Sequence, residues 1–300
     1  MSEQTQYPCR RSWLFAPGNR PEVMAKAIAS PAHAVILDLE DAVPEAEKAE
    51  ARRHVANMLR SHAPASDIFV RINALTTPFA HQDIIDIAAC QPAGIMLPKA
   101  ESASDILTLD WLLSQLECNG GHRTSIVPLI ETASGLAEVR TIATASDRIA
   151  CLAFGAGDFT LDLALAWSRD ESELLPARSE ITLASRLAGL EPPVDSAWIA
   201  ISDSEGMEAS ALRAREHGFQ GKLCIHPRQV TAVNNTYAPS EEEVAKAHRI
   251  VEGFEAQGES NGSAVKIDGT MVDFPVVEAA RRTLADHARA QLRTENPKAA

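Results

Sequence analysis

The chain has 300 residues, of which 45% are hydrophobic and 23% are charged, and its formal net charge is −13. This composition is typical of a globular protein and excludes a disordered tail, a fibrous repeat and a small disulfide-rich scaffold. The acidic balance argues against broad nucleic-acid binding, which requires a basic face. We expect no membrane span, because no window of about 18 apolar residues occurs, and no signal peptide, because the first residues are polar.

The cysteines are spread along the chain, at Cys9, Cys90, Cys118, Cys151 and Cys224. Their odd number and the absence of a CxxC spacing argue against a disulfide framework and against a zinc knuckle. We therefore expect reduced thiols and a cytoplasmic protein.

Short apolar runs rich in β-branched residues alternate with amphipathic stretches along most of the chain. Runs such as AVIL and IVPLI suit strands that are buried on both faces, as in a parallel sheet. Eight such strands separated by helices predict a (β/α)8 TIM barrel, with a doubly wound sheet as the alternative. The predicted strands are residues 12–16, 34–39, 68–73, 94–98, 125–130, 149–154, 194–199 and 222–225.

The chain after the last predicted strand has a different pattern. Residues 239–258 predict a helix with a serine N-cap and an acidic first turn, and residues 275–292 predict a final helix that begins with proline. Between them, residues 262–272 predict an irregular or strand segment. We therefore divide the chain into a barrel domain, residues 11–236, and a C-terminal extension, residues 237–295, that packs on the barrel or on a neighbouring subunit.

Carboxylates stand at the C-terminal ends of the predicted strands, where the active residues of TIM barrels gather. Glu131 and Asp158 end neighbouring strands. Each residue alone is better explained as a helix N-cap, but the pair favours a Mg²⁺ site. Carboxylate ligands alone do not distinguish Mg²⁺ from Mn²⁺. Glu40 and Asp41 lie on the same rim, where they either start a helix or bind metal-bound water.

Basic residues on the same rim have two explanations each. Arg71 ends an apolar strand, so it forms either a salt bridge to these carboxylates or a clamp on a substrate carboxylate. Arg20 and Lys26 lie at and just after a helix start that follows a Pro-Gly turn. They either belong to a solvated helix face or bind an anion such as a phosphate. The Gly-Ala-Gly at 155–157 lacks the third glycine of a dinucleotide fingerprint. Asp273, taken alone, is explained as a structural loop residue.

Several motifs follow one another in a familiar order, from Arg11 to Arg282. Together they resemble the citrate lyase β-subunit-like family, within the HpcH/HpaI aldolase superfamily of acyl-CoA lyases. The motifs are RSWLFAPGNRPEVMAKA (11–27), VILDLEDAVPEAEKAEAR (35–52), VRINA (70–74), GIMLPKAES (94–102), PLIETASGL (128–136), FGAGDFTLDL (154–163), GFQGKLCIHPRQV (218–230) and GTMVDFPVVEAARR (269–282).

The resemblance implies a phosphoenolpyruvate/pyruvate-like TIM barrel with a C-terminal helical extension, assembled as a homotrimer or a multiple of three. It implies Mg²⁺ bound by Glu131 and Asp158. It also implies that Arg71 binds the carboxylate of the oxo-acid half, and that Asp273 is an acid/base inserted into a neighbouring subunit's active site. The positions implied to contact coenzyme A are Phe15, Arg20 and Lys26.

The activity implied by the resemblance is cleavage of a 3-hydroxyacyl-CoA, of the citramalyl-CoA or malyl-CoA type, into a 2-oxo acid and acetyl-CoA. In such a reaction Mg²⁺ assists loss of the hydroxyl proton, and the developing enolate needs fixed positive charge and a proton donor. Family members also run the condensation or hydrolyse the thioester.

Three alternatives stay open. One is a citryl-acyl-carrier-protein lyase β subunit within a citrate lyase complex, and another is a coenzyme A-independent metal aldolase. The third is a non-catalytic assembly module. The presence of Arg71, Glu131, Asp158 and Asp273 argues against it, because a module that had lost its chemistry would be expected to lack one of them. The GTMVDFP segment and the implied coenzyme A positions favour a stand-alone enzyme, with citramalyl-CoA as the first substrate to test.

Overall fold

The computed structural model describes residues 9–62, 65–117, 122–256 and 265–295. These residues belong to two compact units, of which one spans Arg10–Asn234 and the other takes in the chain from Asn235 onward. Within the described ranges, no helix combines the length and the apolar character that crossing a membrane requires. The cysteines of these ranges are free, whereas Cys118 lies outside them.

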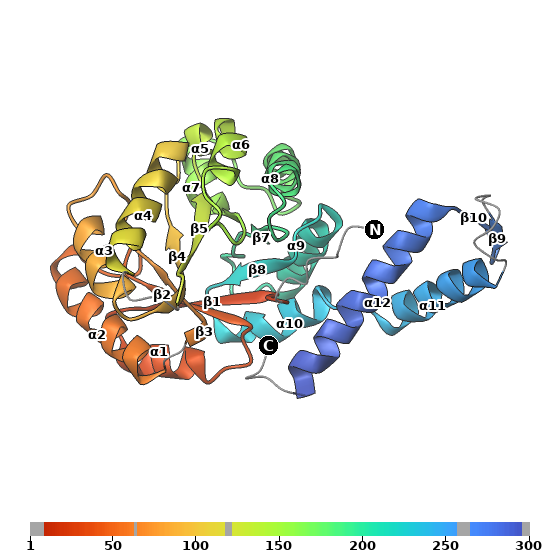
Figure 1. The fold of residues 1–300 in the computed structure, drawn as a ribbon, viewed down its shortest axis with the longest axis horizontal. Helices are drawn as coiled ribbons and strands as arrows, with labels where there is room; N and C mark the ends of the chain where they lie inside the picture. The colour runs from red at the N-terminus through yellow and green to blue at the C-terminus, as the bar shows by residue number, and fades with distance from the viewer. Residues whose placement is uncertain (1–8, 63–64, 118–121, 257–264, 296–300) are drawn as a thin grey trace. The chain divides into compact units, whose positions relative to one another are not determined.

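The first unit is a closed barrel of parallel strands in the order β1 to β8, in which β1 pairs with β8 (Figure 1). Closure confirms the predicted TIM barrel and excludes a doubly wound sheet, whose edge strands stay unpaired. Each strand overlaps a predicted one, but two are much shorter than predicted. The strand predicted at 149–154 is reduced to Ala153–Phe154, with Ile149 in an isolated bridge to Ile126, and the strand predicted at 194–199 is reduced to Val194–Asp195. The strands are β1 (Ser12–Pro17), β2 (Ala34–Asp38), β3 (Ala65–Arg71), β4 (Pro92–Leu97), β5 (Ser125–Ile130), β6 (Ala153–Phe154), β7 (Val194–Asp195) and β8 (Gly221–Cys224).

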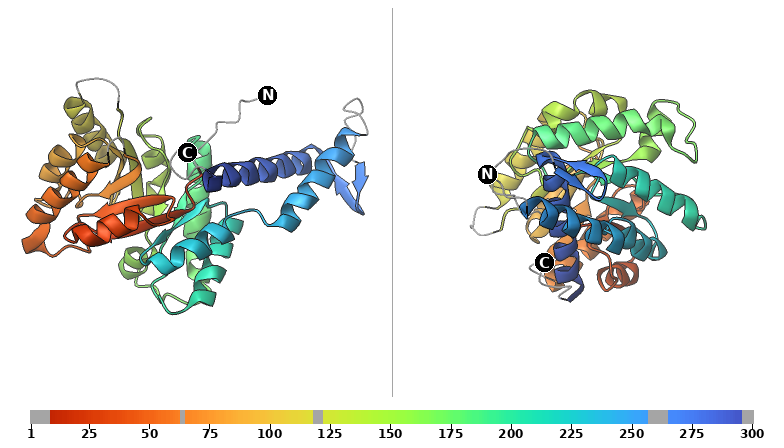
Figure 2. Two further views of the ribbon diagram at one scale, coloured as in Figure 1. Left: turned by 90° about the horizontal axis from the view of Figure 1, so that it is seen from below. Right: turned by 90° about the vertical axis from the view of Figure 1, so that its right-hand side faces the viewer.

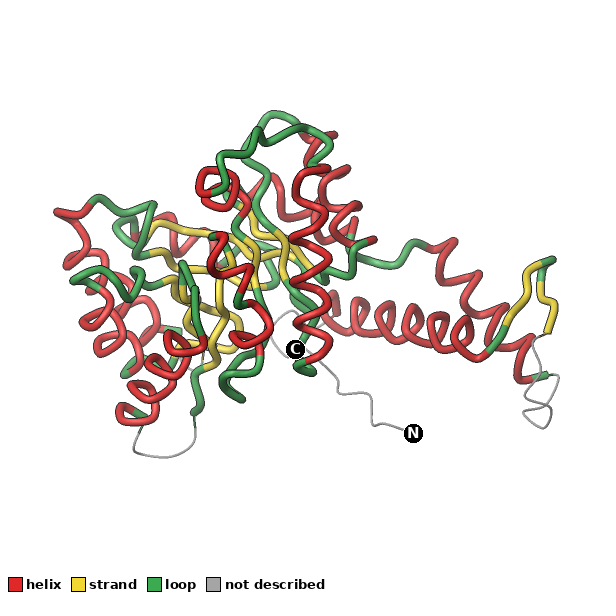
Figure 3. The backbone as a smooth tube through the Cα atoms, turned by 90° about the horizontal axis from the view of Figure 1, so that it is seen from above, coloured by secondary structure: helices red, strands yellow, loops and turns green. Residues whose placement is uncertain are grey.

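Helices connect successive strands and surround the barrel (Figure 3). Helix α4 shows why they form: Ser102 and Asp105 make a capping box at its start. Its buried residues Ile106, Leu109 and Leu113 recur at helical spacing on one face. The helices of this unit are α1 (Pro21–Ile28), α2 (Lys48–Ser61), α3 (Ala80–Ala88), α4 (Ala103–Leu116), α5 (Ala133–Ala137), α6 (Val139–Ala143), α7 (Ala156–Asp162), α8 (Leu175–Leu187), α9 (Ser204–Glu216) and α10 (Pro227–Thr236), with 3-10 turns at Glu45–Glu47 and Ser172–Leu174.

The inside of the barrel is filled with apolar side chains. Trp13 and Phe69 lie with their ring centroids 4.6 Å apart, and both rings are buried. A filled interior is typical of TIM barrels, whose catalytic residues stand at the strand ends. The buried cluster consists of Trp13, Ala34, Ile36, Phe69, Met96, Val127, Leu129, Cys151, Ala153, Val194 and Leu223.

A buried ionic network joins β7 and β8 to α8. The carboxylate of Asp195 accepts hydrogen bonds from Arg178 Nε at 2.9 Å and from Lys222 Nζ at 2.5 Å. Arg178 also pairs with Glu171 at 3.0 Å, and all four side chains are almost fully buried. Burial opposes ionisation of Asp195, but the charges of Lys222 and Arg178 hold its pKa below the usual value.

The C-terminal unit contains two long helices and a hairpin. Helices α11 (Glu241–Glu255) and α12 (Phe274–Glu295) pack side by side, and β9 (Val265–Ile267) pairs antiparallel with β10 (Thr270–Val272) (Figure 2). Ser240 caps α11 through a capping box, as its position predicts. The helix, strand and helix order is therefore confirmed, and the predicted bounds at residues 258 and 262 lie outside the described residues.

Candidate active site at the barrel mouth

Five charged residues converge at the C-terminal ends of β2 to β6. Asp38 and Arg71 are the last residues of β2 and β3 and face each other in the strand register. Lys99 follows β4, Glu131 follows β5 directly, and Asp158 lies in the first turn of α7, after β6. In a parallel barrel these strand ends share one rim, so closure of the sheet brings together residues that are far apart in sequence.

Arg71 is held by three carboxylates and an aromatic ring. Its Nε and Nη2 donate to the two oxygens of Asp38, each at 2.7 Å. Its Nη1 lies 3.0 Å from Glu40 Oε2 and donates to Asp41 at 3.3 Å. The guanidinium carbon lies 4.8 Å from the ring centroid of Phe15, in a cation–π contact. The salt-bridge explanation of Arg71 is thus confirmed, and one Nη2 hydrogen has no acceptor among the described residues.

The contacts of Arg71 set the protonation of its partners. Burial opposes the charge of Asp38, but Arg71 and the backbone N–H groups of Glu40 and Ala42 hold its pKa below the usual value. Burial raises the pKa of Glu40, and Arg71 only partly offsets this effect. Asp38 therefore stays ionised and fixes both the guanidinium and the turn that carries Glu40.

Glu131 is a buried carboxyl, with 3% of its surface exposed. Its Oε1 accepts a hydrogen bond from the backbone N–H of Lys99 at 2.8 Å, and Oε2 has no donor among the described residues. Burial, reinforced by the negative charges of Glu40 and Asp158, raises the pKa of Glu131 to about 8. A bound cation would reverse this effect, because it favours the charged carboxylate.

Gly155 makes room for this carboxyl. The N–H of Gly155 donates to the carbonyl of Ile130 at 3.0 Å, which brings its α-carbon against Glu131. A Cβ at position 155 would lie 2.6 Å from Glu131 Oε2, closer than atoms can pack. A glycine at this position is therefore required by the position of Glu131, and not by a phosphate loop.

The N-cap explanations of the two predicted metal ligands are wrong. Thr132 caps α5 through its side chain, so Glu131 is free of that role. Asp158 lies inside the first turn of α7, whose N-cap is Gly155, and 37% of its side chain is exposed. The start of α7 is held instead by Ser196, whose hydroxyl accepts the N–H of Ala156 at 2.9 Å.

Lys99 has no role in the prediction from sequence, although it follows a strand and a proline, the same signal that marks the other rim residues. Its backbone has a φ of 47°, in the left-handed region that non-glycine residues rarely adopt. Its Nζ lies 3.1 Å from Glu40 Oε1 and 3.7 Å from Asp158 Oδ2. Burial opposes the ammonium charge, but Glu40 and the other carboxylates raise the pKa of Lys99 above its usual value.

The residues of the mouth fit a divalent cation. Among the described residues, the carboxyl groups of residues 38, 40, 41, 131 and 158 face the two cationic side chains of Arg71 and Lys99. Carboxylates outnumber cations even when Glu131 is protonated. Glu40 Oε2 is buried and has no hydrogen-bond donor with suitable geometry, although Arg71 lies nearby. A metal-bound water would supply that donor. No group of three or more His, Cys, Asp or Glu side chains within the described ranges is arranged as a metal site. Mg²⁺ is commonly bound by one or two carboxylates with water and substrate in the other positions, and Glu131 and Asp158 would suffice for that.

The other residues predicted from the sequence are Phe15, Arg20, Lys26 and Asp273. Phe15 reaches the charged residues of the mouth through Arg71, whereas Arg20 and Lys26 are exposed on the segment that forms α1. Asp273 belongs to the C-terminal unit, where it is exposed and its Oδ1 accepts the N–H of Val276 at 3.3 Å. This bond caps α12, in agreement with the structural explanation of Asp273 taken alone.

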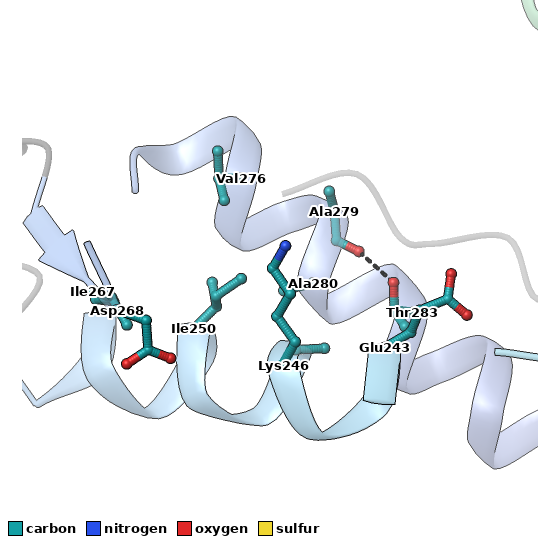
Figure 4. A pocket seen from close by; sticks show the side chains of 10 residues that line it. Glu243, Lys246, Ile250, Ile267, Asp268, Val276, Ala279, Ala280 and Thr283 are labelled. Carbon is teal, nitrogen blue, oxygen red and sulfur yellow. Dashed lines mark hydrogen bonds between the residues drawn. The ribbon is translucent and has the colours of Figure 1, made fainter. Parts of the chain in front are cut away.

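An apolar cavity of about 290 Å³ lies within the C-terminal unit, between α11, α12 and the hairpin (Figure 4). Ile250 and Val276 line it from the two helices, and Ile267 lines it from the hairpin. Its charged lining groups are Glu243 and Lys246 on α11 and Asp268 at the hairpin turn. Its lining contains none of the predicted site residues.

Comparison with known proteins identifies the family. Residues 11–227 match the family described as HpcH/HpaI aldolase/citrate lyase, and residues 192–284 match the C-C bond lyases of the TIM-barrel fold. The chain is 36% identical to citrate lyase subunit beta of Leuconostoc mesenteroides subsp. cremoris, over 92% of each chain. It is 33% identical to L-malyl-CoA/beta-methylmalyl-CoA lyase of Rhodobacter capsulatus, over 93% of this chain and 96% of the relative.

A solved structure agrees with these relatives. Protein CitE from Mycobacterium tuberculosis, in complex with magnesium, acetoacetate and coenzyme A, is 33% identical, with a TM-score of 0.78 over 93% of this chain and 98% of that one. Family match, sequence identity and barrel architecture all agree. The chain therefore belongs to the HpcH/HpaI aldolase/citrate lyase family.

Proposed function

We propose that this chain is a Mg²⁺-dependent acyl-CoA lyase, which cleaves a 3-hydroxyacyl-CoA into a 2-oxo acid and acetyl-CoA. The observation that carries the proposal is the buried carboxyl of Glu131, which lies at the same rim as Asp158 and Arg71. The relative named as a malyl-CoA lyase and the solved relative with magnesium, acetoacetate and coenzyme A support it. Citramalyl-CoA is the first substrate to test and malyl-CoA the second, by family resemblance.

Glu131 and Asp158 would hold the metal, and Glu40 and Asp41 would accept hydrogen bonds from its water ligands. When bound, a divalent cation supplies Lewis-acid stabilisation of negative charge on substrate oxygens. Mn²⁺ can take the same place, because carboxylate ligands do not distinguish the two ions strongly.

Arg71 would bind the carboxylate of the oxo-acid half through its remaining Nη2 hydrogen. Asp38 and Phe15 hold the guanidinium on one edge and one face, so its orientation is set before substrate arrives. Such pre-organisation lowers the entropic cost of binding and favours one substrate geometry.

Asp273 is proposed as the acid/base, delivered by a neighbouring subunit of a homotrimer or a multiple of three. Asp273 would accept the proton of the substrate hydroxyl, the carbon–carbon bond breaks, and its electron pair passes to the thioester to form an enolate. Asp273 then returns a proton to the acetyl carbon, so that atoms and charge balance. Phe15, Arg20 and Lys26 are proposed to contact coenzyme A, the last two through its phosphates.

The test is an assay of purified protein with citramalyl-CoA and malyl-CoA, first with Mg²⁺ and then with EDTA. We expect release of pyruvate or glyoxylate that EDTA abolishes and Mg²⁺ restores. The ratio of the two rates identifies the acid. Release of free thiol without an oxo acid would point to thioester hydrolysis and would contradict the proposal, as would EDTA-resistant release.

The second candidate is the β subunit of a citrate lyase complex, favoured by the relatives that are named citrate lyase subunit beta. It predicts cleavage of a citryl thioester on an acyl carrier protein and little activity on free coenzyme A esters. The double substitution Arg20→Ala and Lys26→Ala distinguishes a coenzyme A-independent aldolase from an acyl-CoA lyase. It would leave the KM of the aldolase unchanged but should raise the KM of the lyase.

The proposed homotrimer is tested by light scattering of the purified protein. A cytoplasmic location is also proposed, supported by the free cysteines of the described ranges. Fractionation of the source cells would check it.

A further inference from the structure

Lys99 combines an unusual backbone with a central position among the carboxylates of the mouth. A left-handed φ of 47° costs a lysine about 1 kcal/mol or more, and such residues cluster at functional sites. This conformation turns the chain directly after β4, so that the backbone N–H points to Glu131 Oε1 at 2.8 Å. The same residue therefore contacts the carboxylate cluster with its backbone and with its side chain.

The ammonium of Lys99 stands between carboxylates from different parts of the barrel. Glu40 comes from the turn after β2 and Asp158 from the first turn of α7, and Nζ lies 3.1 Å and 3.7 Å from their nearest oxygens. Arg71 lies on the other side of Glu40, at 3.0 Å from its second oxygen. Among the described residues, Asp158 has no other cationic partner within ion-pair distance, so Lys99 supplies the positive charge on its side of the mouth.

We propose that Lys99 is a built-in counter-cation of this cluster, which a divalent metal ion displaces from Asp158. The inference rests on the proposed function, since it takes Glu131 and Asp158 as the metal ligands. An ammonium and a metal ion repel each other, so both cannot stay within 4 Å of the same carboxylate without a large loss in affinity. Lys99 can leave, because its stem is flexible and 40% of its side chain is exposed.

Two consequences follow from the displacement. In the metal-free protein, Lys99 keeps Glu40 and Asp158 near each other, although their charges repel. On metal binding, the ammonium must give up Asp158, and the metal affinity is lower than the carboxylates alone would provide. Lys99 is thus a positioning residue that acts through the carboxylates.

The first test measures Mg²⁺ affinity of the EDTA-treated protein by calorimetry, and Mn²⁺ affinity by electron paramagnetic resonance. Lys99→Met should bind either ion at least about tenfold more tightly, because the competing charge is gone. Lys99→Arg, which keeps the charge, should bind like the unaltered protein. Arg186→Gln on the exposed side of α8 removes the same charge away from the mouth and should change the affinity less than about twofold.

A second test uses the unaltered protein, so that it does not depend on the folding of a variant. Reductive methylation followed by mass spectrometry should label Lys99 several-fold faster with Mg²⁺ than with EDTA. Lys26, exposed on α1, should be labelled at the same rate in both.

The outcomes separate the two proposals. Metal affinity that Lys99→Met leaves unchanged or weakens, or labelling of Lys99 that Mg²⁺ does not increase, would overturn the role of Lys99 and leave the proposed function standing. An unaltered protein that binds neither ion, or one whose affinity is unaffected by Asp158→Asn, would instead refute the metal site of the proposed function.

Discussion

Arg71 and Asp38 face each other through two parallel hydrogen bonds, Nε to Oδ1 and Nη2 to Oδ2, each 2.7 Å long. The carboxylate is buried and stays ionised, so the pair behaves as one rigid unit at the barrel mouth. This unit presents the remaining N–H of the guanidinium in one direction, which is what recognition of a small anion requires.

Replacing Asp38 with Asn should therefore impair activity through Arg71. An amide puts an N–H donor against a guanidinium that only donates, so the parallel pair is lost. We expect kcat/KM for the acyl-CoA substrate to fall about 10²-fold, as a misplaced binding group does. We also expect the free energy of unfolding to fall by about 3 kcal/mol, as for a broken buried ion pair.

The matched control is Asp41→Asn, because Asp41 contacts the same guanidinium at 3.3 Å but is exposed. Its effect on kcat/KM should stay below about tenfold. Equal effects of the two substitutions, measured by steady-state kinetics, would show that the Asp38 pair does not orient Arg71.

Gly155→Ala should disturb the metal site without unfolding the barrel. The added methyl would lie 2.6 Å from Glu131 Oε2, so the carboxyl must move. We expect weaker Mg²⁺ binding by calorimetry and at least about a tenfold loss in kcat, because site geometry is sensitive to shifts of this size.

Gly157→Ala, two residues away in α7, is its control. A Cβ at position 157 meets nothing nearer than Trp167, at 4.0 Å. This substitution should leave Mg²⁺ binding unchanged and stabilise the helix by about 0.5–1 kcal/mol. If both alanine variants bind Mg²⁺ normally, the close packing of residue 155 on Glu131 does not affect metal binding.

The pKa of about 8 at Glu131 predicts how the stability of the metal-free protein depends on pH. The folded protein keeps this proton up to about pH 8, whereas the unfolded chain releases it near 4.5. The folded state therefore binds more protons in this window, and its stability falls as pH rises from 4.5 to 8. The proton on Glu131 contributes at most about 5 kcal/mol to the free energy of unfolding, and about 2 kcal/mol or more of this is lost between about pH 6 and 8.5.

Glu131→Gln should remove this slope, because glutamine copies the protonated carboxyl and does not titrate. The measurement is the free energy of unfolding of the EDTA-treated protein in urea, at about pH 6 and at about pH 8.5. An identical pH dependence in the variant and the unaltered protein would mean that Glu131 is already ionised in the folded state.

Asp195→Asn should destabilise the barrel without acting on the mouth. Asp195 accepts from Arg178 and Lys222, and its loss leaves two buried cations without their shared carboxylate. We expect a loss of about 3–5 kcal/mol in the free energy of unfolding. Glu180→Gln, which breaks the exposed pair with Arg140, should cost no more than about 1 kcal/mol. Chemical denaturation that gives similar values for both would contradict a structural role for the buried network.

Asp273→Asn should abolish cleavage and leave folding intact. Asparagine is as good an N-cap as aspartate, so the bond to Val276 survives, but it cannot carry the proton. The measurement is the rate of oxo-acid release together with the melting temperature. Full activity in this variant would remove Asp273 from the proposed mechanism.

Much of the mouth could be predicted from the sequence, because its residues stand at strand ends and the barrel has one rim for such ends. Glu131, Asp158 and Arg71 were predicted in this way, and the structure brings them to the same rim. Asp38 and Lys99 stand in the same kind of position, yet their partners depend on side-chain directions and on a left-handed backbone that local sequence does not specify.

Local pattern was sufficient for the architecture. Strands buried on both faces and amphipathic helices carry their own periodicity, so the order of strands and helices could be predicted from hydrophobic spacing and capping residues. The C-terminal hairpin was predicted only as an irregular or strand segment. The contacts between neighbouring strands could not be predicted in this way. The register between β2 and β3 sets Asp38 against Arg71, which is 33 residues away in the sequence. The pKa of Glu131 likewise depends on burial and on charges from three other strand ends, and such long-range terms exist only once the sheet has closed.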